Sequence, residues 1–419
     1  MKPSIKLIAF LALVMTSHTV SGQQVIRIED CYESAKNNYP LIKQKELLAS
    51  SRDFTLANAK SGYLPQFSIY GQATYQSAVT EIPNPLVEPL SKDQYKIYAE
   101  VNQVIYDGGG IKNQNALQEV TNQVETEQVE VELHKIKERI NQLFFGALLI
   151  DAQLAQVELL KKDLQSNIEK TESAIRNGVA LRSTKDMFSA EYLKAQQRTI
   201  ELKSTRNAYL LMLGNFVNQT LNENAILEKP TVVALPSDIT INRPELTLYN
   251  YQTDQIAAQY AVGNVRNLPK LSLFVQGGYG RPGLNMLLNE FDAYYLGGIR
   301  LSWTLGGFYN QQRDKSLRDN KLQMIGVQRE TFLFNTNLSL QQAEQEILKL
   351  RQLIAVDNDL IALRSSIKNT SRKQLDNGVI TEHDYLLDLN AEDQARQNQS
   401  LHEVQLMMAY YNYKTLSGN

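Results

Sequence analysis

Four stretches of the chain alternate between apolar and polar residues, which is the pattern of amphipathic β-strands. In the first of them, Phe67 and Ile69 share one face with Ala73, while glutamine, serine and threonine side chains share the other. The four predicted strands cover residues at about 64–80, 92–106, 268–281 and 292–305. We therefore expect two pairs of strands, each pair joined by a loop.

Two stretches that follow the strand pairs contain no proline and predict long helices. Proline is absent from 90–229 and again after residue 282. In the first stretch, apolar residues recur at alternating steps of four and three from Val129 to Ile168, with one exception. This period of 3.5 residues is typical of coiled-coil packing. A helix over 111–177 would be about 100 Å long at about 1.5 Å per residue.

Each proline-free stretch is broken once, by an Asn-Gly-Val motif at 177–179 and another at 377–379. Glycine readily adopts the left-handed conformation that ends a helix. Ser183 or Thr184 in the first copy, and Thr381 in the second, are placed to cap the helix that follows. Each stretch is thus predicted to form a helical hairpin with a tight tip.

The order helix, strand, strand, long helix, tip, long helix occurs twice. Leu-Pro pairs precede the first strand of each copy at 64–65 and 268–269, which are 204 positions apart, and the two tips are 200 positions apart. We interpret the chain as a duplication. Its predicted parts are a signal segment at 1–22, a first repeat at 23–229 and a second repeat at 230–419.

The N-terminus has the layout of a secretory signal. Lys2 and Lys6 precede the apolar run "LIAFLALVM", and small and polar residues follow it up to Gly22, after which cleavage is expected. A frayed terminal helix is the alternative. No later segment holds 18 uninterrupted apolar residues, so we expect an exported chain without a transmembrane helix.

Composition narrows the possible chemistry. With 43 basic and 45 acidic residues the net charge is −2, which gives no sign of a nucleic-acid partner. The single cysteine, Cys31, excludes a disulfide within the chain and is expected to pack inside a helix. His134, His383 and His402 are isolated and expected on helix surfaces, and no hydrolase, phosphate-loop or zinc-protease motif occurs. We therefore expect no enzyme activity, no cofactor and no metal site.

An exported chain with four amphipathic strands must hide one strand face from water and satisfy the strand edges. One alternative is a soluble sandwich, or a sheet laid against helices. The other is the wall of a lipid-facing barrel, whose strands need about 9–11 residues and point polar side chains inward. Lys96, Glu100 and Arg300 on the polar faces favour a wet barrel lumen. Four strands cannot close a barrel, whereas three chains would supply twelve.

The Leu-Pro pairs, the "YDGGG" after the second strand, the paired "NGV" breaks and the repeat of about 200 residues together resemble the TolC-like outer membrane efflux proteins. The resemblance runs from about residue 25 to the C-terminus. It implies a mainly α-helical fold with transmembrane β-strands: a homotrimer with a 12-stranded barrel in outer-membrane lipid of a Gram-negative bacterium, and an α-helical barrel in the periplasm. It also implies an exit duct of a tripartite efflux pump or type I secretion system. Its partners would be a periplasmic adaptor (a membrane fusion protein) and an inner-membrane transporter.

The resemblance also suggests a periplasmic gate at the tips. Asp384 falls on the family's acidic ring position, and Asp388 lies beside the second one. A capping role for Asp384 at the helix N-terminus is the alternative. Leu375 and Ile380 replace the tyrosine and arginine of the family's latch, so we expect a different pairing. The candidates are Arg182 or Lys185 with Glu382 or Asp384.

The tips themselves match the family's adaptor-contacting motifs. These residues are Asn177, Gly178, Val179, Asn377, Gly378 and Val379. Helix ends are the alternative explanation for the glycines, and the two roles are compatible. The first alternative function for the whole chain is a periplasmic coiled-coil adaptor. The second, less favoured alternative is an exported enzyme.

Overall fold

The computed structural model describes residues 25–80, 89–232 and 240–419. The predicted signal segment at 1–22 therefore lies outside the described residues, as does part of the loop after the first strand. The chain divides into two compact units, which we describe separately. The first unit comprises Met1–Tyr39, Leu133–Ile241 and Thr336–Asn419, and the second comprises Pro40–Glu132 and Asn242–Asn335.

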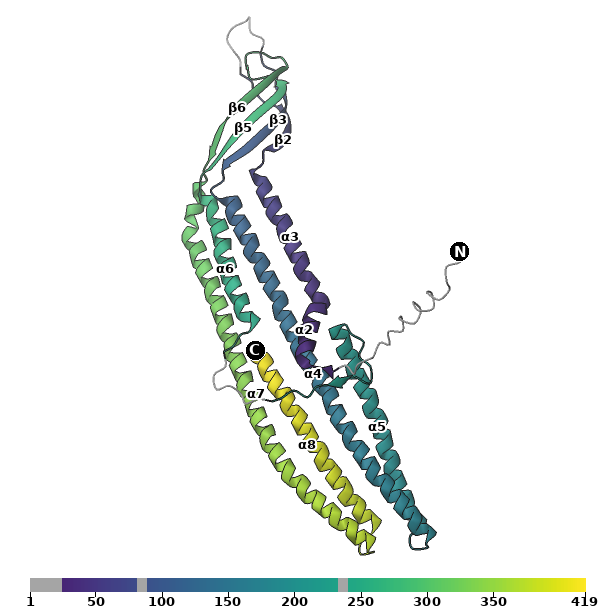
Figure 1. Ribbon diagram of the computed structural model, residues 1–419. Coiled ribbons are helices and arrows are strands. Elements are labelled where there is room, and N and C mark those ends of the chain that lie inside the picture. Colours follow the sequence, from purple (N-terminus) through teal and green to yellow (C-terminus); the bar gives the residue numbers. More distant parts are fainter. Residues whose placement is uncertain (1–24, 81–88, 233–239) are drawn as a thin grey trace, which may run out of the picture. The chain divides into compact units, whose positions relative to one another are not determined.

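The second unit contains a four-stranded antiparallel sheet in the order β2-β3-β5-β6 (Figure 1). Its strands are β2 (Gln66–Tyr75), β3 (Asp93–Tyr106), β5 (Lys270–Arg281) and β6 (Asp292–Ser302). They lie where the alternation predicts them, but β2 and β6 end earlier than expected. The strand predicted up to residue 305 ends at Ser302, and the following Trp303 donates its indole N–H to the Asn267 carbonyl at 3.0 Å. The short helix η5 (Leu305–Tyr309) then begins.

Helices of the second unit continue from the sheet. They are η2 (Pro40–Ile42), α3 (Lys43–Lys60), η3 (Ser61–Tyr63), α6 (Pro244–Asn264), η4 (Val265–Asn267) and the beginnings of α4 (Gly110–Arg176) and α7 (Gln311–Asp376). α4 lies between α3 and α6 (Figure 1): Asn122 donates to the Leu48 carbonyl of α3 at 2.9 Å, and Gln255 of α6 donates to Thr121 at 3.0 Å. Arg318 of α7 stacks over Tyr260 of α6 at 4.6 Å.

The "YDGGG" motif makes the junction between β3 and α4. The Asp107 carboxylate accepts the backbone N–H groups of Gly109 at 2.8 Å and Ile111 at 2.6 Å, and so caps the helix. Gly108 and Gly109 have φ values of 73° and 82°, which favour glycine. A Cβ on Gly108 would lie 2.8 Å from the Cβ of Leu268, whereas a Cβ on Gly109 would meet nothing within 4 Å.

The first unit is built from long helices. It contains α2 (Ile28–Asn38), α5 (Arg182–Val217), α8 (Glu382–Ser417) and the remaining parts of α4 and α7, together with β1 (Val25–Ile26) paired in parallel with β4 (Ile226–Leu227). Seam residues predicted from the 3.5-residue period are buried, such as Val157 and Leu164. They pack with Phe188 of α5 and with Tyr385 and Leu389 of α8.

Among the described residues, one helix, α4, is long and apolar enough to cross a membrane by length and composition alone, with a window of mean hydropathy 1.6. Its most apolar part is packed in the first unit. Phe145 lies 5.4 Å from the Tyr411 ring of α8, and Phe144 and Leu148 are buried beside it. Only 28% of that window is buried within the chain, so packing inside one chain accounts for only part of its hydropathy.

Both tips have the same geometry. α4 and α7 end in Schellman motifs, in which Gly178 and Gly378 take φ values of 73° and 70°. The N–H of Val179 reaches the Ala174 carbonyl at 3.0 Å, and that of Val379 reaches the Gln374 carbonyl at 2.8 Å.

The caps that follow the tips differ. Thr381 and Asp384 form a capping box at the start of α8. The expectation of a Ser183 or Thr184 cap was wrong. α5 begins at Arg182, so Ser183 and Thr184 already lie inside its first turn, and Leu181 at the cap position has no side-chain acceptor for the helix N–H groups.

The junction glycines provide a test of stability. We expect Gly109→Ala to cost about 1 kcal/mol, because a left-handed backbone disfavours a Cβ. Gly108→Ala should cost measurably more, because it adds the close approach to Leu268. Chemical denaturation of the two purified variants, followed by helical circular dichroism, measures the difference. Equal losses would contradict the steric role of Gly108.

Candidate functional site

The sheet has one apolar face. Directly paired residues share a face, and the register places the odd-numbered residues of all four strands together up to a bulge after Val104, beyond which Tyr106 pairs with Leu271 and joins this face. Their side chains include Phe67, Ile69, Ala73, Ile97, Ala99, Val101, Leu271, Leu273, Val275, Ile299 and Leu301. The chain leaves this face uncovered: Phe67 is 79% exposed and Ile69 78%. A soluble sheet that packs this face on the chain's own core is therefore excluded.

Aromatic side chains mark both ends of the apolar face. Tyr75, Tyr95 and Tyr279 lie toward the loop ends of the strands, and Tyr106 lies toward the helices with Trp303 just beyond β6. Aromatic rings on either side of an aliphatic band are typical of surfaces that sit at the two interfaces of a bilayer. The distribution fits a transmembrane strand wall.

The even-numbered residues form the opposite, polar face. The predicted lumen residues Lys96, Glu100 and Arg300 all lie on it. Glu100 is only 8% exposed and accepts a hydrogen bond from Gln276 at 2.5 Å and one from Arg300 at 3.2 Å. The Arg300 guanidinium also stacks 4.4 Å from the Phe274 ring centroid. The structure thus brings Glu100 and Arg300 together. Lys96 lies four residues from Glu100 along β3, on the same face.

At the tips, a cavity of about 480 Å³ lies between the two hairpins of the first unit. Val179 and Ala180 line it from the first hairpin, and Asn377, Gly378 and Ile380 line it from the second. The six tip residues predicted to contact a partner are all exposed, and Val179 and Val379 present bare apolar side chains at 78% and 69% exposure. The tips therefore offer a small apolar surface beside a groove.

The predicted gate residues are paired within their own hairpins. Lys185 contacts Glu172 at 2.7 Å, and this hydrogen bond and charge hold the pKa of Glu172 below its usual range. Asp384 accepts hydrogen bonds from the Thr381 hydroxyl at 2.7 Å and the Thr381 N–H at 3.1 Å. These bonds lower the pKa of Asp384, as expected of the capping alternative.

The other gate candidates have no contact between the tips either. Asp388 accepts a hydrogen bond from the Ser371 hydroxyl of α7. Arg182 is exposed, and Glu382 lines the cavity. Within one described chain, none of the expected pairs of Arg182 or Lys185 with Glu382 or Asp384 is formed. A latch between tips stays a prediction for an assembly.

One pair near the second tip was missed from the sequence. Arg372 donates to the Tyr385 hydroxyl at 3.3 Å and stacks over the same ring at 5.5 Å. Arg372 lies within one helical turn of Leu375, and Tyr385 directly follows Asp384. Motif positions taken one at a time do not show that these two side chains meet. The arrangement supplies an arginine–tyrosine contact within the second hairpin, close to its tip.

A charged layer around the buried Glu392 carboxylate connects the two hairpins. Lys368 of α7 contacts Glu392 of α8 at 2.6 Å and Asp163 of α4 at 3.4 Å, and Arg396 contacts the other oxygen of Glu392 at 2.7 Å. Glu392 is only 4% exposed. Burial alone would raise the pKa of Glu392, but the hydrogen bonds from Lys368 and Arg396 outweigh it and lower that pKa.

The histidines were expected on helix surfaces, and two of them are instead partly buried. His134 contacts the Thr415 carbonyl at 2.8 Å, and His402 contacts the Asp357 carboxylate at 2.6 Å. His383 is exposed. No group of three or more potential metal ligands occurs in the part of the chain that the structure describes.

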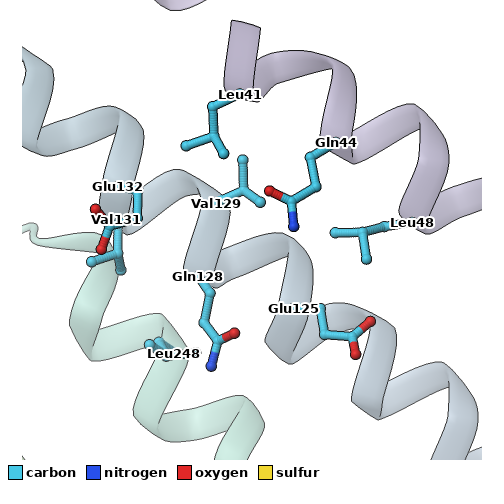
Figure 2. A pocket seen from close by; sticks show the side chains of 9 residues that line it. All are labelled: Leu41, Gln44, Leu48, Glu125, Gln128, Val129, Val131, Glu132 and Leu248. Atoms are coloured by element: carbon cyan, nitrogen blue, oxygen red, sulfur yellow. The ribbon is translucent and has the colours of Figure 1, made fainter.

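The second unit also contains a groove of about 610 Å³ on α4 (Figure 2). Gln44 and Leu48 reach it from α3 and Leu248 reaches it from α6, and between them lie Val129 and Gln128 of α4. Glutamates 125 and 132 also line it. The lining mixes aliphatic, amide and carboxylate groups without a catalytic constellation.

Comparisons with known proteins agree with this geometry at the level of the fold. No family model matches the chain, and no curated protein sequence matches it. Solved structures do. VceC, an outer membrane protein of Vibrio cholerae, is 12% identical with a TM-score of 0.67, over 94% of this chain and 96% of VceC.

Two further structures are similar to the same extent. The CmeC outer membrane channel of Campylobacter jejuni is 14% identical with a TM-score of 0.66, over 93% of this chain and 85% of CmeC. The MtrE outer membrane channel of Neisseria gonorrhoeae, in its open state, is 12% identical with a TM-score of 0.66, over 93% of this chain and 89% of MtrE. The chain therefore has the fold of TolC-like outer membrane channels.

The charged layer provides a test. Lys368→Met removes one partner of the buried Glu392 carboxylate, so we expect a loss on the order of 2 kcal/mol at neutral pH. Because the pKa of Glu392 is lowered in the folded chain, the stabilisation is present above the ordinary carboxyl pKa and is lost as pH falls through the lowered one. The loss caused by Lys368→Met should therefore shrink in acid.

Denaturant unfolding at several pH values measures both effects. The matched control is Lys194→Met, because Lys194 makes an exposed contact with Glu191 at 3.7 Å on α5, in the other hairpin of the same unit. A Lys368→Met variant as stable as this control would show that the layer contributes nothing.

Proposed function

We propose that the chain is the outer-membrane channel of a tripartite efflux pump, an exit duct from the periplasm to the exterior of a Gram-negative bacterium. The observation that carries this proposal is the two-faced sheet, with a bare apolar face flanked by aromatic rings and a polar opposite face. The shared fold with solved outer membrane channels supports it. A type I secretion system would use the same duct.

A homotrimer follows from the edges of the sheet. β2 and β6 each pair on one side only, so each leaves a row of backbone donors and acceptors open. Three copies joined edge to edge give a closed barrel of twelve strands, wide enough for an aqueous lumen. Lys96, Glu100 and Arg300 would then face that lumen, and the odd-numbered residues would face outer-membrane lipid.

The repeated order of elements supports an internal duplication. α3, β2, β3, α4 and α5 follow one another in the first half, and α6, β5, β6, α7 and α8 follow in the same order in the second. The two Schellman tips are equivalent positions of that repeat. We place the repeats at 23–229 and 230–419.

We assign the tips to gating and docking. Three copies of Asp384 around an axis would repel one another, and in that ring Asp384 would titrate at higher pH than in the single chain. Arg182 or Lys185 of one tip would pair with Glu382 or Asp384 of a neighbouring tip. The exposed Asn-Gly-Val motifs would contact a periplasmic adaptor, which joins the duct to an inner-membrane transporter and opens it.

A soluble adaptor is the second candidate, because it also uses long helical hairpins. The uncovered apolar face argues against it, since such a surface is not stable in water.

Cysteine labelling tests the barrel. The native chain has one cysteine, Cys31, which is buried, and burial raises its thiol pKa to about 12, so it should not react. Ser68→Cys and Ile69→Cys place a thiol on opposite faces of β2. In outer-membrane preparations, a water-soluble thiol reagent should label Ser68→Cys and not Ile69→Cys.

The control is the same pair in denaturant, where both thiols should react. Ile69 is 78% exposed in the isolated chain, so only a covering layer of lipid would protect it. Equal labelling of the two variants in the membrane would exclude the barrel.

The gate proposal predicts a change in conductance. Arg182→Glu should raise single-channel conductance in planar bilayers, because it breaks the predicted pairing and adds negative charge beside Asp384. Lys203→Glu, an equal charge change at an exposed position of α5 away from the tip, is the control. Unchanged conductance for Arg182→Glu would remove Arg182 from the gate.

A further inference from the structure

One row of paired positions on the polar face carries three tyrosines. Tyr70 of β2 pairs with Tyr98 of β3, Tyr98 pairs with Gly278 of β5, and Gly278 pairs with Tyr294 of β6. These three residues, which we call the tyrosine row, thus cross the whole width of the sheet at one level. The row lies near the loop ends of β5 and β6.

Two of the three rings stack on each other, and the third lies over the glycine. Tyr70 and Tyr98 are stacked, with ring centroids 5.1 Å apart and an interplanar angle of 27°. A Cβ on Gly278 would lie 2.6 Å from the Cβ of Tyr98 and 2.9 Å from the ring of Tyr294. Because Gly278 has no side chain, Tyr98 and the ring of Tyr294 can both lie close to β5 at this position.

The row keeps aromatic surface available to a solute. Tyr70 is 45% exposed, and Tyr98 and Tyr294 are half-buried. On one side of the row the Glu100 carboxylate is already held by Gln276 and Arg300. On the other side Lys96 and Asp292 occupy one level with opposite charges. The charged groups on either side of the row thus balance in sign. The tyrosine rings are therefore the feature that distinguishes this level of the polar face.

We propose that the tyrosine row is a binding site for aromatic cations inside the channel. Tyrosine rings attract a positive charge over their faces and stack with flat rings, so a solute that carries both gains two favourable contacts. This inference rests on the proposed function, because the polar face lines a lumen only in the closed barrel. Three copies would place nine tyrosines around the lumen at one level.

Channel block in planar bilayers tests the site. Benzyltrimethylammonium is compared with butyltrimethylammonium, which has the same charge and no ring, each added on the loop side. The wild type should be blocked by the benzyl compound at about fivefold lower concentration. The triple variant Tyr70→Leu, Tyr98→Leu, Tyr294→Leu should lose this difference, and the triple phenylalanine variant should retain it.

Two controls keep the outcome interpretable. Trimer bands on gels and the single-channel conductance without blocker show that each variant assembles. Gly278→Ala leaves all three tyrosines present but displaces their rings, so it should also weaken block by the benzyl compound. If the leucine variant fails to assemble, the wild-type comparison and Gly278→Ala still decide the matter.

The two proposals fail in different ways. Wild-type channels blocked equally by both cations, or a leucine variant that keeps the difference, would overturn the site alone. A wild-type protein that forms no channel, or labels equally at Ser68→Cys and Ile69→Cys in membranes, would overturn the barrel and the site with it.

Discussion

The rest of the structure depends on the unequal faces and open edges of one four-stranded sheet. A sheet buries its apolar face against another layer in a soluble domain, and here the chain provides no such layer. Its outer strands also leave backbone groups without partners from the sheet. Lipid satisfies the first requirement and further strands satisfy the second, and a closed barrel in a membrane supplies both.

The kind of side-chain contact that packs the long hairpins changes along their length. Near the tips, an aromatic contact between Phe188 and Tyr385 at 6.4 Å belongs to a compact apolar core. Farther along, Lys368, Glu392 and Asp163 form a charged layer in the same packed seam. An ion pair fixes which side chains face one another, whereas leucines can slide past one another with little cost. The contact of Lys368 with Asp163 at 3.4 Å thus favours one register of the two hairpins.

Much of this fold could be predicted from the sequence, because its patterns are long and regular. Alternation over ten residues leaves little doubt about a strand, and Val157 and Leu164 lie on the seam that the 3.5-residue period predicts. Turn chemistry predicted the glycine tips. It failed at Leu181, where backbone geometry alone starts the helix.

What the sequence could not supply were contacts that depend on register between distant segments. The tyrosine row needs the exact pairing of β3 with β5, whose residues are far apart along the chain, and tyrosine fits either face of an amphipathic strand. The contact of Arg372 with Tyr385 likewise requires two helices to meet at one level. Single-position comparison with a family motif does not show such pairs.

The capped junction at Asp107 has a mechanical consequence. The strand passes into α4 through three glycines, of which one is packed against Leu268 and the helix start is fixed by the carboxylate of Asp107. A junction held in this way cannot rotate freely. In the proposed channel, any twist of α4 would therefore have to spread along the helix, because the capped junction with β3 leaves it no free joint.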